Sequence, residues 1–366
     1  MKCKVCKKEK PISSFLGVCR DCILEKFEKC YPFIKSAHQH ARAEFGLPTF
    51  PPRDKTGVQC KVCGNECRIG NGEIGYCGLV KNVNGKLVRL AGTPDRGLLE
   101  WYYDPHVTNC VASWACPAGT GCGYPKFSYT NGPEYGFYNL AIFYGACNFN
   151  CLFYQNWHFK HLTKNLHPLV SAEELANAIN EKVSCVCFFG GTPEPQMPHM
   201  INTSKLMVEK SKGRILRICM ECNGNANARL LKKFAELSFE SGGIIKFDLK
   251  FFNEKLNIAL TGVSNKKSYK NFEMLASTFS GRKEYHFLHA STLLIPHYVS
   301  LDEIQQIASF ISSLDERIPY SLLGFYPHYK MTDLGFTKKD FALKALKIAK
   351  RAGLKNVRIG NVHLLV

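Results

Sequence analysis

From about residue 137 onward, apolar runs typical of β-strands alternate with segments typical of helices. Two capping boxes, Ser171 with Glu174 and Ser300 with Glu303, are expected to begin two of these helices. This alternation predicts an α/β fold built on a parallel sheet or a (β/α) barrel. The expected strands are residues 138–145, 184–190, 214–222, 243–251, 285–296, 320–327 and, closing the chain, 356–360.

The loop after the first of these runs carries the strongest chemical signal. Cys147, Cys151 and Tyr154 occupy the three cysteine positions of a C-x3-C-x2-C pattern. Three thiolates at that spacing can hold three irons of a [4Fe–4S] cube and leave the fourth iron open to a ligand. Because only two thiols are present, the loop indicates an iron–sulfur site whose ligand set is incomplete.

With Phe153 before its last position, this loop resembles the radical S-adenosylmethionine (SAM) superfamily, and within it proteins similar to pyruvate formate-lyase activating enzyme. The resemblance extends over residues 60–366 and implies an incomplete (β/α)6 barrel. It also implies an oxidoreductase that takes one electron from a low-potential donor and cleaves SAM to methionine and a 5′-deoxyadenosyl radical. That radical would abstract hydrogen from a protein glycine, as in glycyl-radical activation, from another macromolecule or from a small molecule.

The resemblance also implies where SAM binds, at the carboxyl ends of the strands. The backbone of Phe153 is expected near the adenine, and a glycine pair ending the second strand near the amino group of SAM. Thr192 replaces the acidic residue of relatives there, although Glu194 follows two positions later. Alternation along a strand places the polar residues of the third and fourth strands on one face, within reach of SAM. The expected SAM contacts are Phe153, Gly190, Gly191, Thr192, Glu221, Asn223, Asp248 and Lys250.

Tyr154 makes the activity of this chain the main question. A tyrosine has a reference pKa of about 10, so it is a poor ligand at neutral pH unless the metal removes its proton. Three explanations compete: an inactive variant of an active protein, a natural degenerate member, or a working tyrosinate-ligated cluster. The first two are favoured together, so the enzyme is expected to be impaired.

Two further cysteine groups precede the expected barrel at residues 137–366. Residues 1–30 contain two C-x2-C pairs, which predict a zinc-ribbon-like module, and residues 31–59 form a proline-containing linker. Residues 60–136 are a cysteine-rich region with a second four-cysteine site, for which zinc or an auxiliary iron–sulfur cluster both fit. The ligands would be Cys3, Cys6, Cys19 and Cys22 in the first group and Cys60, Cys63, Cys67 and Cys77 in the second.

The remaining cysteines fit no standard spacing. Cys110, Cys116 and Cys122 surround a glycine-rich loop that is expected near the active site, with ligation by Cys110 or Cys116 as the less favoured alternative. Cys185 and Cys187 lie within an expected strand and are interpreted as core residues.

Composition limits the class of protein. The chain of 366 residues has a formal net charge of +18 and contains 18 cysteines, with no secretory signal and no apolar run long enough to cross a membrane. These features favour a cytoplasmic protein of a reducing, oxygen-poor cell. Bound thiolates would offset part of the charge, so a nucleic-acid partner is not favoured. The alternative to an enzyme is a non-catalytic zinc or iron–sulfur adaptor that binds nucleic acid or a protein.

Overall fold

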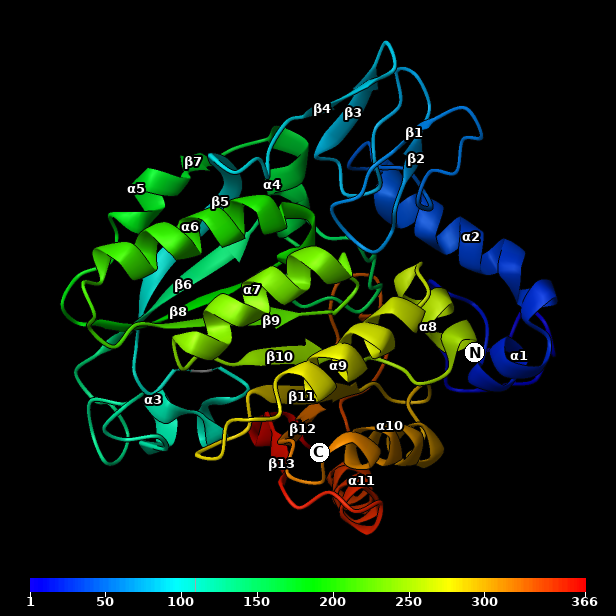
Figure 1. Ribbon diagram of the computed structural model, residues 1–366. Coiled ribbons are helices and arrows are strands. Elements are labelled where there is room, and N and C mark those ends of the chain that lie inside the picture. The colour runs from blue at the N-terminus through cyan, green and yellow to red at the C-terminus, as the bar shows by residue number, and fades with distance from the viewer. Residues whose placement is uncertain (109) are drawn as a thin grey trace.

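A central sheet of nine strands organises the molecule, which is described by a computed structural model covering residues 1–108 and 110–366 (Figure 1). The strand order is β13-β12-β11-β10-β9-β8-β6-β5-β7. Seven of these strands are parallel and correspond to the seven predicted ones, which confirms the predicted α/β fold with a central parallel sheet. They are β6 (Tyr138–Tyr144), β8 (Val183–Gly190), β9 (Arg217–Cys222), β10 (Ile245–Asp248), β11 (Leu288–Leu294), β12 (Tyr320–Gly324) and β13 (Val357–Gly360).

Helices connect the parallel strands, and α6, α7 and α9 lie along one face of the sheet (Figure 1). Phe188 of β8 and Phe234 of α7 pack edge to face across this interface, with ring centroids 5.9 Å apart. Ser171 and Ser300 accept hydrogen bonds from the amides of Glu174 and Glu303, so both predicted N-caps are present. The helices are α4 (Phe159–Asn165), α5 (Ala172–Ala176), α6 (Met197–Lys210), α7 (Ala228–Glu240), α8 (Glu254–Thr261), α9 (Lys266–Thr278), α10 (Leu301–Leu314) and α11 (Lys339–Arg351).

Two strands of the large sheet were not expected from the sequence. Strand β5 (Arg96–Pro105) runs antiparallel to β6, and β7 (Leu169–Ser171) runs antiparallel to β5. Half of β5 is exposed, so it lacks the continuous apolar pattern of the central strands. Within the described residues β13 pairs with β12 alone, so the sheet does not close on itself.

Short elements surround this sheet. Two small antiparallel hairpins precede the sheet, and two short helices follow β5. None of the helices in the described residues is both long and apolar enough to span a membrane. These elements are β1 (Val58–Gln59), β2 (Arg68–Ile69), β3 (Val80–Val83), β4 (Lys86–Arg89) and α3 (Pro117–Thr120), together with the short 3-10 helices Ser113–Ala115, Glu194–Gln196 and Val362–Leu364.

The N-terminal segment holds a four-cysteine group next to helices α1 (Arg20–Glu25) and α2 (Phe27–Ala43). The Sγ atoms of Cys3, Cys6, Cys19 and Cys22 all lie within 4.8 Å of one another. Two of their distances, Cys3 to Cys22 and Cys6 to Cys19, are 3.9 and 4.0 Å. A tetrahedral ion with bonds of about 2.3 Å to sulfur needs sulfur atoms about 3.8 Å apart. The group therefore has the geometry of a single-ion metal site.

Helix α2 docks on helix α8 and on the loop that follows β6 (Figure 1). His38 is fully buried. Its Nδ1 accepts a hydrogen bond of 2.8 Å from the side-chain amide of Asn150, and its Nε2 lies 3.1 Å from the Ala259 carbonyl oxygen. A neutral ring protonated on Nε2 satisfies both contacts. At the end of the same helix, the Tyr329 hydroxyl donates to the Ala41 carbonyl at 2.6 Å. The N-terminal helix is thus fixed to the loop that contains Cys147 and Cys151.

Removing the metal from the N-terminal group should destabilise the protein. The four cysteines belong to or pack against the main hydrophobic core and have the geometry of a single-ion site, so bound metal would supply folding free energy. Treatment with a thiol-competitive chelator is expected to release the metal ion of this group, so at least one ion per chain, and to lower the Tm by about 5 °C or more. Metal analysis and thermal unfolding by circular dichroism measure both effects. Cys30→Ala, which changes a buried thiol outside the group, should keep the metal; loss of metal from it would contradict the assignment.

Acid should weaken the docking of helix α2 through His38. Burial lowers the pKa of His38 to about 4, with Arg42 and Lys160 adding to the effect, below the unfolded value of about 6.5. The unfolded chain then binds the extra proton between these values, so stability is complete above pH 6.5 and is lost as the pH falls toward 4.

Urea unfolding at pH 7.5 and pH 5 tests this dependence. His38→Gln removes the titration, so its loss of unfolding free energy between the two pH values should be smaller than that of the unchanged protein by about 2 kcal/mol. His40→Gln changes an exposed histidine on the same helix and should behave like the unchanged protein. Equal acid sensitivity of the His38 variant and the unchanged protein would rule out this role.

Candidate functional site

A cavity of about 570 Å³ opens at the carboxyl ends of the parallel strands, a volume typical of small-molecule sites. Residues from β8, β9, β10 and β11, from the loop after β6 and from the C-terminal segment line it. The structure thus gathers every residue predicted to contact SAM or the cluster around one cavity. They are Cys147, Cys151, Phe153, Tyr154, Gly190, Gly191, Thr192, Glu221, Asn223, Asp248 and Lys250.

The loop from Cys147 to Tyr154 is buried and its polar groups are satisfied by distant segments. The amides of Asn150 and Leu152 donate to the carbonyls of Thr261 and Leu260, at 2.7 and 3.0 Å, at the end of helix α8. Backbone groups buried without partners would cost free energy, so these bonds define the path of the loop.

Four asparagines hold the other side of the loop. The side chain of Asn65 donates to the Asn148 carbonyl, that of Asn148 to the Asn225 carbonyl, and that of Asn225 to the side-chain oxygen of Asn65, at 2.6 to 2.8 Å. Asn223 donates to the side-chain oxygen of Asn148 at 2.7 Å. The amide of Asn223 is therefore used within the protein, in the binding of the loop to β9 and to the cysteine-rich segment.

Both loop thiols are buried and protonated in the absence of metal. Burial raises the pKa of Cys147 to about 12, with the neighbouring Cys151 adding to the effect. Burial also raises the pKa of Cys151, while Lys250 opposes the shift. A bound cation would remove these protons. The pair can therefore supply two thiolate ligands to a metal cluster.

Tyr154 does not supply the third ligand in this conformation. Its hydroxyl shares its one proton between the carbonyls of Gly190 and Gly191, the second at 2.8 Å, and its ring packs against Phe159 with ring centroids 5.5 Å apart. Burial raises the pKa of the phenol well above its usual value, and the two nearby cysteines raise it further. To bind iron the phenol would have to lose both hydrogen bonds and its proton. The residues present thus fit two of the three positions of a thiolate-bound [4Fe–4S] cluster, and the third position does not fit.

The glycine pair at the end of β8 is required by close backbone contact. Gly190 has φ of +116°, and a Cβ there would lie 2.4 Å from the Tyr144 amide nitrogen. A Cβ on Gly191 would lie 2.2 Å from the Ala146 carbonyl oxygen. These contacts bring β8 directly against the loop after β6 and leave the backbone of the pair facing the cavity.

Thr192 and Glu194 form a buried pair below these glycines. The Thr192 hydroxyl donates to the Glu194 carboxylate, which also accepts a 2.7 Å hydrogen bond from the Gly224 amide. Burial raises the pKa of Glu194 to about 7, although both hydrogen bonds lower it. Glu194 is fully buried and connects β8 to the turn after β9, so it does not occupy the place of the acidic residue that Thr192 replaces.

A chain of charges forms the other wall of the cavity. Lys246 Nζ lies 3.0 Å from Glu221 and 2.9 Å from Asp248, and Lys250 Nζ lies 3.6 Å from Asp248. Burial alone would raise the pKa of Asp248, but the two lysines outweigh it and lower the pKa. The network alternates in sign, so it can orient a ligand that carries both an ammonium and a carboxylate group.

Lys246 is the main site residue that the sequence analysis missed. It lies two residues before Asp248, on the same face of β10, and the alternation that placed Asp248 and Lys250 also applies to it. Ser291, which donates to Asp248, was also missed, because a serine inside a strand gives no distinctive sequence signal.

The second predicted four-cysteine site lies beside the loop. Cys63 pairs with Ala226 in an isolated bridge, and an Arg89 guanidinium nitrogen lies 3.9 Å from Cys60 Sγ. Burial raises the pKa of Cys67 to about 12, with Cys77 and Cys60 contributing. In the described part of the chain, only the N-terminal group brings its ligand atoms within 4.8 Å of one another. Ligation by Cys60, Cys63, Cys67 and Cys77 stays a prediction.

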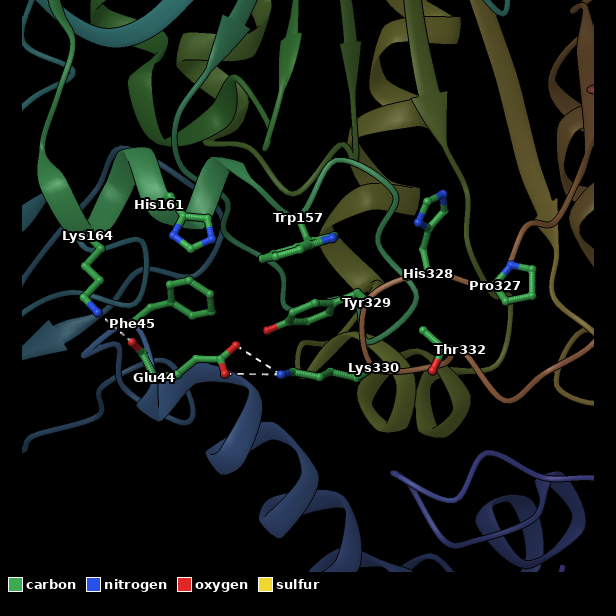
Figure 2. Close-up of a pocket in the computed structure, with 10 residues that line it drawn as sticks. All are labelled: Glu44, Phe45, Trp157, His161, Lys164, Pro327, His328, Tyr329, Lys330 and Thr332. Carbon is green, nitrogen blue, oxygen red and sulfur yellow. Dashed lines mark hydrogen bonds and ion pairs between the residues drawn. The ribbon is translucent and has the colours of Figure 1, made fainter.

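Another cavity, also of about 570 Å³, lies on the outer side of the loop (Figure 2). Trp157 stacks on Tyr329 with ring centroids 5.5 Å apart, and Lys330 binds Glu44 at 3.1 Å. None of the residues predicted to contact SAM or the cluster lines it. The Lys330–Glu44 ion pair joins the end of helix α2 to the segment after β12.

Comparisons with known proteins agree with this arrangement. Residues 141–311 match the model of the Radical SAM superfamily. An uncharacterised protein of Methanocaldococcus jannaschii is 25% identical over 321 residues, which cover 84% of this chain and 83% of that protein. A second protein of the same organism, named "Putative glycyl-radical enzyme activating enzyme", is 30% identical over 210 residues, 56% of this chain and 74% of its own length.

Solved structures are more distant. A domain of pyruvate-formate lyase-activating enzyme from Bacteroides vulgatus is 19% identical, with a TM-score of 0.39 over 48% of this chain and 98% of that domain. Streptococcus suis SuiB bound to S-adenosylmethionine is 16% identical, with a TM-score of 0.42 over 60% of this chain and 49% of SuiB. The family match and the coverage of the second relative, together with the cysteine loop at the end of the first parallel strand, establish that the chain belongs to the radical SAM superfamily.

Proposed function

We propose that this chain is a radical SAM oxidoreductase of the activating-enzyme type whose own activity is impaired by Tyr154. The observation that carries the proposal is the single cavity that contains two cluster thiols, the glycine pair and the charged network. In relatives with three cysteines, a [4Fe–4S] cluster and one electron convert SAM to methionine and a 5′-deoxyadenosyl radical. Here Cys147 and Cys151 would hold two irons.

The protein's own groups would bind and orient SAM. The alternating charges of Glu221, Lys246 and Asp248 suit the amino and carboxylate groups of its methionine part, and the backbone of Gly190 and Gly191 lines the same cavity. Phe153, whose ring centroid is 6.4 Å from that of Phe251, lines the cavity, and its backbone would contact the adenine. These residues are all present in this chain, and only Thr192 departs from the acidic residue of relatives, so SAM binding should survive the loss of the third cysteine.

Tyr154 supports the proposed impairment through its hydrogen bonds. A hydroxyl that donates to two backbone carbonyls stabilises the wall of the SAM cavity, and moving it to iron would cost the desolvation of both carbonyls. A cluster with two protein thiolates should therefore be labile.

The substrate and the other metals extend this proposal. The name of the 30% identical relative supports a protein glycine as substrate, and a small molecule is the other class. A low-potential protein would deliver the electron. The N-terminal group would bind zinc, for which four thiolates at tetrahedral spacing are the usual structural site, and the group at Cys60 would bind zinc or an auxiliary cluster.

Restoring the cysteine should restore SAM cleavage. The unchanged protein and Tyr154→Cys are reconstituted anaerobically with iron and sulfide, given SAM and dithionite, and assayed for 5′-deoxyadenosine. A three-thiolate ligand set is expected to raise product formation by roughly 100-fold, because restoring a ligand should matter at least as much as an outer-shell partner of a ligand does. SAM affinity, measured by calorimetry, should change far less.

Tyr154→Phe and Cys147→Ala in the Tyr154→Cys background serve as controls. The first keeps the ring and removes the hydroxyl, so it should be as inactive as the unchanged protein. The second removes a cluster thiol and should abolish the restored activity. Product from the unchanged protein that Tyr154→Phe lacks would instead identify a tyrosinate ligand. Inactivity of Tyr154→Cys with no SAM binding would leave the adaptor as the better account.

A further inference from the structure

Six cysteines outside the proposed SAM site lie together where the loop after β5 packs against strands β8 and β9. Cys187 and Cys219 are buried in one cluster with Phe127 and Tyr285, and the other four cysteines pack against it. Three of the six come from strands β8 and β9, and three come from the loop that follows β5. The full set is Cys110, Cys116, Cys122, Cys185, Cys187 and Cys219.

The pairing of β8 with β9 brings three of these cysteines together. Cys185 and Cys187 are two residues apart on β8 and share a face, and Cys187 pairs with Cys219 on β9. The Sγ atoms of Cys185 and Cys219 are 3.7 Å apart. The sulfur atoms therefore point into the same interior space from two neighbouring strands.

The loop after β5 brings the other three cysteines against β8 and β9, and hydrogen bonds hold it there. Trp114 donates from its indole nitrogen to Ser321 on β12 at 3.0 Å, and Ser321 donates to the Val111 carbonyl at 3.3 Å. Cys110 donates to the Glu221 carboxylate at 3.3 Å. The six-cysteine cluster thus lies next to the charged network at the floor of the SAM cavity.

A buried cation lies beside the cluster without a carboxylate. Arg282 is 8% exposed, and its guanidinium donates to the Gly243 carbonyl at 2.7 Å and lies among aromatic rings, the nearest centroids being those of Phe239 and Tyr285 at 4.6 and 4.7 Å. Within residues 1–108 and 110–366 no acidic group lies within ion-pair distance of it. A buried charge without a counter-charge is costly, and neutral thiols supply none. Thiolates bound to metal would supply negative charge at this place.

The separation of the six sulfur atoms bears on what they could hold. A single tetrahedral ion needs its four sulfur ligands about 3.8 Å apart, and in the described residues only the N-terminal group of cysteines meets a 4.8 Å limit as a set of three or more. Cys185 and Cys219, whose Sγ atoms are 3.7 Å apart, could bind one metal atom together, but in the described residues no third ligand joins them within 4.8 Å. A polynuclear cluster takes its other ligands at other irons, farther away. The arrangement therefore favours an iron–sulfur cluster over one zinc ion.

We propose that these six cysteines provide the ligands of a second iron–sulfur cluster, placed inside the sheet beside Glu221 and distinct from the Cys147–Cys151 site. Four of the six would suffice for an iron–sulfur cluster, with Cys116 of the loop and Cys185 of β8 among them because they join the two halves of the set. Arg282 balances the negative charge of the thiolate-bound cluster.

The test begins from Cys147→Ala with Cys151→Ala, which removes the first site and makes the result independent of SAM cleavage. This double variant is reconstituted anaerobically and assayed for iron, acid-labile sulfide and zinc, and by Mössbauer spectroscopy. The double variant should retain iron and acid-labile sulfide, in amounts similar to each other. Adding Cys116→Ala and Cys185→Ala should remove most of them, whereas adding Cys222→Ala, a buried thiol on β9 that packs in the opposite core, should not.

Circular dichroism verifies that each variant folds. If the quadruple variant does not fold, Cys116→Ser replaces it, since this half-buried residue lies outside the strands. The proposal is overturned if the double variant holds no iron and sulfide, if the iron is unaffected by loss of Cys116 and Cys185, or if zinc alone is found. A Cys185–Cys219 disulfide in the anaerobic protein, detected by mass spectrometry, would also overturn it.

Discussion

The structure depends on burying one loop. The segment from Cys147 to Phe153 is buried at the carboxyl end of β6, and its backbone and asparagine side chains must find partners inside the protein. Helix α8 satisfies two of its amides, and Asn65 and Asn225 satisfy its asparagine. The order of the loop therefore derives from segments before and after it in the chain, and the N-terminal region is part of the site.

That dependence explains why Tyr154 is accommodated without disorder. The phenol enters a place where two carbonyls, those of Gly190 and Gly191, would otherwise face an apolar ring edge or a ligand. It stabilises the folded protein by the same contacts that withhold its oxygen from iron. At position 154 folding and metal binding therefore have different requirements. Tyr154 supplies the hydrogen bonds that stabilise the loop, but it does not supply the thiolate that a cluster needs.

Periodic patterns account for what could be predicted. The seven parallel strands and the shared face of Asp248 and Lys250 follow from side-chain alternation, which is local in sequence. Strand β5 escaped prediction because its exposed aromatic residues give no regular pattern. Lys246 was missed although it lies inside the predicted strand 243–251 and the alternation that placed Asp248 and Lys250 also applies to it. The six-cysteine cluster could not be found from spacing, since its members come from β8, β9 and a loop after β5. Such proximity is set by tertiary packing alone.

The docking of the N-terminal helix has a consequence for the order of folding. His38 contacts Ala259, Ser13 contacts Tyr298 and Ala41 contacts Tyr329, across sequence separations of 221, 285 and 288 residues. Closing chain loops of this length is entropically costly and slow. During synthesis the N-terminal segment emerges first and its partners emerge last. The loop that carries Cys147 and Cys151 thus reaches its final surroundings only when nearly the whole chain has been made.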